Sequence, residues 1–255
     1  MDTALFQAVV LGLIAFFGYM HSFMGSTMHN RPIIIAPLVG LLFGDLQKGI
    51  MIGATLELIW MGAFPIGASN PPDMVSGAII GTAFAIISNQ DTPAAVALAV
   101  PIASLVLIFD NMLMTFFIPF LSSKADKYAE EGDFRGVEKM HLIAVLGVKG
   151  LLSAIVALGF YLGAPSVTSI LSSIPEFVTE GLNVATGLLP AIGFAMLAKM
   201  IMNKKLLPFF LLGFLLTSYM KISVLGVALF GVVIAMLVAG ADKKIEGGAV
   251  DDNEF

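Results

Sequence analysis

The chain has 255 residues, of which 58% are hydrophobic and 12% charged, and its mean hydropathy of +0.96 is above what a water-soluble domain of this length tolerates. Its 18 acidic and 13 basic residues give a formal net charge of −5 without a long basic run, which argues against nucleic-acid binding. It has no cysteine, which excludes disulfides, thiolate nucleophiles and Cys-based metal sites. The apolar residues form long blocks rather than alternating short segments, so the sequence predicts an all-α, polytopic membrane helical bundle in a lipid bilayer.

Some apolar stretches are long enough to cross a bilayer as helices, and others are not. A spanning helix needs about 20 mostly apolar residues, and four stretches meet this requirement: 4–20, 93–121, 142–162 and 182–202. Three others are short and bounded by Gly, Pro, Asp or Asn: 32–44, 49–64 and 74–88. Short apolar pieces of this kind predict re-entrant hairpins and broken helices, which usually line the substrate site of a transporter.

One extended polar segment, residues 122–141, alternates basic and acidic side chains. It predicts a solvated helix broken near Gly132, and the positive-inside rule places this segment in the cytoplasm. Counting spans onward puts the Lys-free stretch 163–181 outside and the Lys-containing clusters 203–205 and 242–244 inside. These assignments agree with one another.

The last part of the chain contains an interrupted apolar piece and a polar tail. The piece 206–239 is interrupted at 218–223, which predicts two short spans with Lys221 near the outer end. The tail 241–255 is small and acidic, so we expect a disordered cytoplasmic segment. Residues 1–240 are then predicted to form one membrane-embedded domain.

Glu57 lies within an apolar run that begins "GATLELIW" at residue 53. A carboxylate facing lipid costs a few kcal/mol, so we expect Glu57 to face the protein interior or a wet cavity. A purely structural role is the alternative, in which Glu57 pairs with Arg31 or Lys48 and holds two broken helices together. Arg31, in "MHNRP", is expected either to orient a neighbouring carboxylate or to anchor the chain at the membrane interface.

The same run ends in "SNPPD", which brings further polar groups together. Two prolines without backbone donors leave carbonyls beside Ser69 and Asn70, and Asp73 follows them. Such a mixture of donors and acceptors suits an uncharged, polyhydroxylated ligand. The alternatives are a helix N-cap for Asp73 and turn positions for the other two residues.

Other polar residues give weaker signals. In "GLNVATG", Asn183 and Thr186 are placed near an expected helix start, where they either cap the helix or reach the ligand. His21, His29 and His141 are too scattered for a metal motif and are expected to pack at the surface or interface. No metal and no cofactor is expected.

Several motifs follow one another in the order found in a known family. They are the entry "NRP" at 30–32, "GD" at 44–45, "GATLEL" from 53 and "PPD" at 71–73, and the match continues through 174–202 and "LPFFLLGF" at 207–214. With these residues the chain resembles the enzyme IIC subunit of the mannose-type sugar phosphotransferase systems. That family covers mannose, fructose, sorbose and N-acetylgalactosamine permeases.

The resemblance implies a permease subunit of a group-translocation system in the bacterial inner membrane. IIC and a partner subunit, IID, form the membrane part as a trimer of pairs with an elevator-like motion. Cytoplasmic IIA and IIB proteins pass a phosphoryl group to the sugar, so the IIC subunit is not catalytic alone.

The resemblance also assigns residues. It makes Glu57 and Asp73 the sugar-contacting acids, and we add Asn70, Ser69 and Asn183 as candidate substrate contacts. Arg31 and Asp45 are expected to orient or support them. The mannose members have Asn where this chain has Pro65, which favours the N-acetylgalactosamine, galactosamine or sorbose branch.

Two other functions fit the residues. An ion-coupled secondary sugar transporter would use Glu57 and Asp73 as its ion site. A membrane scaffold would use Glu57 for an interhelical pair and leave binding to its partner. The sequence itself leaves the transported sugar open.

Overall fold

The computed structural model describes residues 3–63, 70–172 and 176–247, and these residues form helices and connecting turns without strands. The predicted all-α class is confirmed. The chain divides into two compact units, Met1–Leu197 and Ala198–Phe255, each of which is described by itself. One membrane domain over 1–240 therefore stays a prediction.

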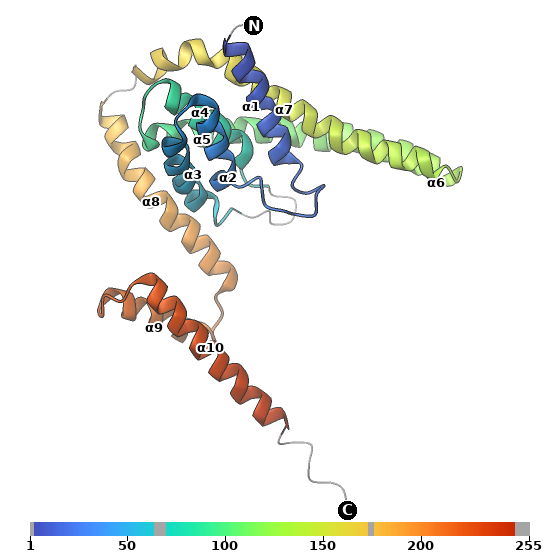
Figure 1. The fold of residues 1–255 in the computed structure, drawn as a ribbon. Coiled ribbons are helices and arrows are strands. Elements are labelled where there is room, and N and C mark those ends of the chain that lie inside the picture. Colours follow the sequence, from blue (N-terminus) through green and yellow to red (C-terminus); the bar gives the residue numbers. More distant parts are fainter. Residues whose placement is uncertain (1–2, 64–69, 173–175, 248–255) are drawn as a thin grey trace, which may run out of the picture. The chain divides into compact units, whose positions relative to one another are not determined.

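A core of the first unit forms where α1 (Thr3–Tyr19) packs on α7 (Phe134–Ser172) and on the short helices between them (Figure 1). Leu11 and Ala15 of α1 are fully buried. Phe160 of α7 is also fully buried, and its ring lies 5.8 Å from the rings of Phe43 and Phe84, centroid to centroid. This aromatic cluster joins α7 to the two short hairpins described next.

The first short hairpin consists of α2 (Pro32–Phe43) and α3 (Leu46–Trp60). Gly44 ends α2 with φ +77°, a conformation that glycine adopts without strain, and Asp45 caps α3 by accepting a hydrogen bond from Lys48 N at 3.0 Å. The helices touch through backbone, because a Cβ on Gly40 would lie 2.9 Å from the Cα of Gly49. The "GD" pair thus makes the turn between two helices in close contact.

The second short hairpin consists of α4 (Met74–Ile87) and α5 (Thr92–Met112). Small residues again permit close packing, since a Cβ on Gly77 would lie 2.8 Å from Ala99 O. Trp60 Nε1 donates a hydrogen bond to Pro72 O at 3.2 Å and so links the end of the first hairpin to the start of the second. The short pieces predicted at 32–44, 49–64 and 74–88 correspond to the short helices α2, α3 and α4, although α3 runs from Leu46 to Trp60 and Phe64 lies outside the described residues.

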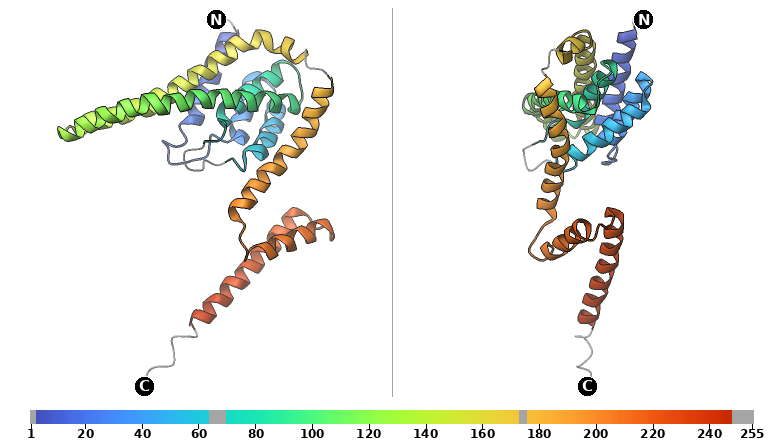
Figure 2. Two further views of the ribbon diagram at one scale, coloured as in Figure 1. Left: turned by 180° about the vertical axis from the view of Figure 1, so that it is seen from behind. Right: turned by 90° about the vertical axis from the view of Figure 1, so that its left-hand side faces the viewer.

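Among the described residues, two segments are long and apolar enough to cross a membrane: Thr92–Glu130, of 39 residues, and Phe134–Pro165, of 32. The first is α5 continued through a π-helical stretch, η1 (Leu113–Phe117), into α6 (Ile118–Glu130). Gly132, at φ +73°, makes the turn into α7, as the sequence predicted. The helices α6 and α7 then lie side by side, which Figure 2 shows from behind.

The remaining helices are α8 (Glu176–Ile201), α9 (Leu207–Ser218) and α10 (Val224–Gly247). The predicted interruption at 218–223 is confirmed as the turn between α9 and α10, with Lys221 at φ +56°. Since α10 continues to Gly247, helix extends into the tail from residue 241 for which we expected disorder. Its charged residues there, such as Lys243 and Lys244, are compatible with helix.

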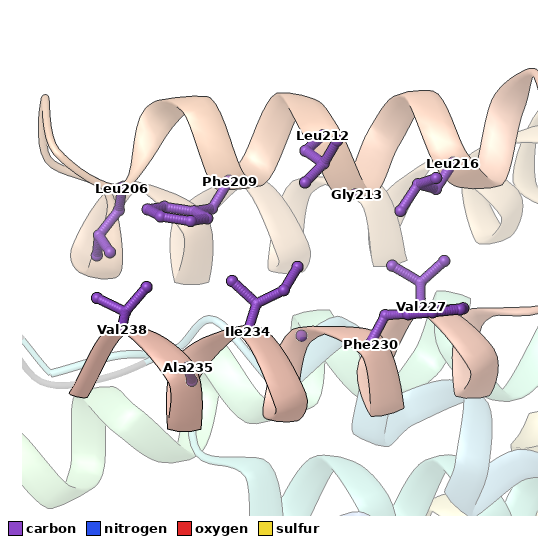
Figure 3. Close-up of a pocket in the computed structure, with 11 residues that line it drawn as sticks. Leu206, Phe209, Leu212, Gly213, Leu216, Val227, Phe230, Ile234, Ala235 and Val238 are labelled. Carbon is purple, nitrogen blue, oxygen red and sulfur yellow. The ribbon is translucent and has the colours of Figure 1, made fainter. Parts of the chain in front are cut away.

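An apolar groove of about 460 Å³ runs between α9 and α10 (Figure 3). Its walls are aliphatic and aromatic side chains with small residues among them: Leu206, Phe209, Leu212, Gly213, Leu216, Val227, Phe230, Gly231, Ile234, Ala235 and Val238. The side chains of this groove offer no hydrogen bonds to a sugar, whereas a cavity in the first unit is lined by polar side chains.

Candidate functional site

A polar cavity of about 380 Å³ lies in the first unit, where the end of α1, the start of α4, the end of α5 and the middle of α7 meet. Its volume is within the range of about 300–1,000 Å³ that is typical of small-molecule sites. Polar and charged side chains on its wall are Tyr19, His21, Ser22, Ser26, Asn30, Arg31, Asn70, Asp73, Asp110 and Lys149. The cavity therefore offers both donors and acceptors, as a polyhydroxylated ligand requires.

Asp73 is fixed at the N-terminus of α4 by groups from three helices. Its Oδ2 accepts hydrogen bonds from Ser76 N at 2.9 Å and from the Tyr19 hydroxyl at 2.6 Å. Its backbone N–H donates to Ala103 O at 3.1 Å. Asp73 is thus the N-cap that the sequence offered as an alternative, and it also lines the cavity. A side chain fixed in this way is preorganised for a ligand.

Glu57 forms the ion pair with Arg31 that the sequence offered as the structural alternative. Arg31 donates to Glu57 Oε1 through Nε at 2.7 Å, and Nη2 lies 2.5 Å from the same oxygen. The other oxygen accepts from Ile33 N, in the first turn of α2, at 3.3 Å, where the helix dipole favours negative charge. Arg31 lines the cavity, whereas Glu57 is not among the described residues of its wall. Glu57 therefore contacts Arg31, which in turn faces the cavity.

Of the other predicted substrate contacts, Asn70 is exposed and lines the cavity. Ser69 and Pro65 lie outside the described residues. Asn183 was expected near a helix start, but its backbone lies inside α8, which begins at Glu176, so its capping role was wrong. Gly181 also lies inside α8, where a glycine is tolerated at a cost of about 1 kcal/mol.

Several residues on the cavity wall were not predicted from the sequence, among them Tyr19, Asp110 and Lys149. Lys149 Nζ lies 3.7 Å from Asp110 Oδ1 and 5.5 Å from the centroid of the Tyr19 ring. A signal was available for two of them, because Asp110 and Lys149 are charged residues within predicted spans. The rule that drew attention to Glu57 applies equally to them.

Comparison with known proteins finds one matching family and several similar proteins. The sequence profile of the family described as PTS system sorbose-specific IIC component matches residues 5–237. The sorbose-specific EIIC component of Klebsiella pneumoniae is 37% identical over 212 residues, which are 82% of this chain and 79% of that protein. A candidate N-acetylgalactosamine permease IIC component 2 of Escherichia coli K12 is 48% identical over 103 residues, 40% of this chain and 77% of that protein.

Solved structures support the same architecture. A structure described as that of a membrane protein superposes with a TM-score of 0.81 at 32% identity, covering 92% of this chain and 95% of that one. A cryo-EM structure of the mannose transporter ManYZ in complex with microcin E492 gives a TM-score of 0.54, with the same identity and coverage. The fold of this chain is therefore shared with solved structures of membrane proteins.

Proposed function

Because the chain belongs to the family of PTS sorbose-specific IIC components, we propose that it binds a hexose or amino sugar in the polar cavity and carries it inward. As a IIC component it is an integral protein of the bacterial inner membrane, a permease subunit that is not catalytic alone. The observation that carries the proposal is the cavity wall, where Asp73 is held by Tyr19 and Ser76 beside Asn70.

For the sugar, we infer N-acetylgalactosamine or galactosamine. Support comes from the 48% identity to the N-acetylgalactosamine permease component over 103 residues. The sorbose-specific relative is 37% identical over a longer stretch of 212 residues, so sorbose is the competing substrate. A panel of these sugars and mannose decides between them.

For the partners, we propose a IID subunit that pairs with this chain, with the pairs forming a trimer, and cytoplasmic IIA and IIB proteins that deliver the phosphoryl group. The family resemblance supports this arrangement and the elevator-like motion. In the site, we assign direct sugar contacts to Asp73 and Asn70. Glu57 orients Arg31, and Asp45 supports the first hairpin. Ser69 and Asn183 remain candidate contacts.

The function is tested by uptake into vesicles that contain this chain and its IID partner. Sugar phosphate should accumulate only when phosphoenolpyruvate and the soluble phosphocarriers are supplied. Uptake of free sugar driven by an ion gradient alone would instead identify the secondary transporter. The Arg31–Glu57 pair argues against that alternative, because a carboxylate already neutralised by Arg31 is a poor cation site.

The site is tested by Asp73→Asn, because Asn keeps the size of the side chain and its capacity to cap a helix while removing the charge. We expect sugar binding about tenfold weaker, since hydrogen bonds to charged groups are the stronger ones, with assembly unchanged. The matched control is Asp45→Asn, the same change at the N-cap of α3, which should leave sugar affinity unaltered. Equal affinities for wild type and Asp73→Asn would remove Asp73 from the site.

A further inference from the structure

Asp110 and Lys149 lie close together in the structure but form no direct hydrogen bond. The distance of 3.7 Å between Lys149 Nζ and Asp110 Oδ1 is too long for a hydrogen bond. Asp110 Oδ1 is buried and forms no hydrogen bond within the described part of the chain. Both side chains are largely withdrawn from the surface, at 22% exposed for Lys149 and 19% for Asp110. A buried carboxylate oxygen without a hydrogen-bond donor is energetically unfavourable, so we expect a bound ligand to supply a donor to it.

A hydroxyl group fits this gap chemically. It donates one hydrogen bond and accepts others, whereas the Lys ammonium only donates and the carboxylate only accepts. A hydroxyl between Lys149 Nζ and Asp110 Oδ1 would accept from the first and donate to the second. It would give both groups the hydrogen bonds that they do not make with each other.

The pair is connected to the proposed sugar contact through one side chain. Lys149 Nζ lies 5.5 Å from the centroid of the Tyr19 ring, and the Tyr19 hydroxyl donates to Asp73 at 2.6 Å. Asp110, Lys149, Tyr19 and Asp73 all line the same cavity. A ligand bound at Asp73 would thus lie in the same cavity as Asp110 and Lys149.

The backbone near Asp110 carries an independent sign of function. Three residues after Asp110, the helix changes to the π-helical stretch Leu113–Phe117. Stretches of this kind are rare and occur frequently at functional sites. The π-helix gives the end of α5 a local geometry that a regular α-helix would not provide.

We propose that Asp110 and Lys149 form a second sugar-binding pair that holds one ring hydroxyl between them and selects for sugars that carry it. This rests on the proposed function, namely that the polar cavity binds the sugar. The pair adds a hydroxyl-specific contact to the one at Asp73. Lys149 donates to the hydroxyl oxygen, and that hydroxyl donates to Asp110 Oδ1.

The test measures binding to the purified complex of this chain and its IID partner by calorimetry. The ligands are the sugar with the highest affinity in the panel of N-acetylgalactosamine, galactosamine, sorbose and mannose, and its monodeoxy analogues. Asp110→Asn and Lys149→Met should each weaken binding of the parent sugar about tenfold. For one deoxy analogue only, the variants and the wild type should bind equally, because the hydroxyl that the pair holds is already missing.

Matched controls carry the same substitutions outside the cavity. Asp126→Asn and Lys139→Met change exposed residues of α6 and α7 and should bind every ligand as the wild type does. If the single variants fail to assemble, the double variant Asp110→Asn/Lys149→Met removes both charges together and is measured instead. A merely structural role predicts that every analogue loses affinity by the same factor, and that result overturns the proposal.

Failure of the pair is distinguishable from failure of the function. A wild-type complex that binds none of the four sugars contradicts the proposed function itself. A wild-type complex that binds sugar but loses no affinity when any single hydroxyl is removed contradicts the pair alone. That second measurement needs no variant, so the outcome does not depend on how the variants fold.

Discussion

The two ion pairs Arg31–Glu57 and Asp110–Lys149 are similarly buried but very differently bonded. Side-chain exposure is 15% and 17% in the first pair and 22% and 19% in the second. In the first, the guanidinium and the Ile33 N–H occupy both carboxylate oxygens. In the second, the closest approach is 3.7 Å. Burial therefore does not distinguish the two pairs, whereas hydrogen bonding does.

Residue chemistry explains part of this difference. The planar guanidinium of Arg presents several donors in a fixed geometry, which matches a carboxylate and holds two helices in register. The Lys ammonium is a point charge on a flexible stem, which adapts to a ligand. We infer that the Arg31–Glu57 pair stabilises the first hairpin, and that the Asp110–Lys149 pair is available for binding.

Breaking the closed pair should give the largest effect. Arg31→Met leaves the Glu57 carboxylate buried without its cation, so we expect the free energy of unfolding to fall by about 3 kcal/mol. The double variant Arg31→Met/Glu57→Gln should recover most of this loss, because the unpaired charge is then gone. Denaturant titration of the detergent-solubilised complex measures both. Lys149→Met should lower the free energy of unfolding much less. Equal losses of unfolding free energy in Arg31→Met and Lys149→Met would contradict the comparison.

Removing the donor to Asp73 should have an intermediate effect. Tyr19→Phe deletes the hydroxyl that bonds Asp73 Oδ2 at 2.6 Å, so we expect sugar affinity to fall about tenfold, as for a hydrogen bond to a charged group. Calorimetric titration with the preferred sugar measures it. Tyr161→Phe, the same change at an exposed position of α7, is the control and should bind like the wild type. Matching affinities for Tyr19→Phe and wild type would show that Asp73 needs no orientation.

The smallest effect should come from the hairpin turn. Gly44 has φ +77° and nothing within 4 Å of an added Cβ, so Gly44→Ala costs conformational energy only, about 1 kcal/mol. Gly159→Ala in α7 also adds a methyl group in open space but at a helical position, and it should stabilise slightly. Neither change should alter sugar affinity. A loss of affinity in Gly44→Ala without a loss of stability would make the turn part of the site.

Much of the local structure was predictable from residue types. The Gly, Pro, Asp and Asn residues around the short apolar pieces indicated where these pieces end, and the Pro-Pro-Asp motif allowed Asp73 as a cap, because these signals act over a few residues. The pairing of Tyr19 with Asp73 spans 54 positions, and no local pattern encodes which helices meet. For Glu57 the sequence offered both roles, and the observed geometry supplied its partner. Direct sugar contacts remain predictions that the variants above address.

The glycine contact between α2 and α3 has a mechanical consequence. Since Gly40 and Gly49 meet backbone to backbone, no layer of side chains lies at that crossing that could repack into a second arrangement. Interfaces change state by repacking side chains, and a crossing without them has few states to choose from. We therefore expect the first hairpin to be rigid. We expect α2 and α3 to move as one body, together with Arg31, in any displacement during transport.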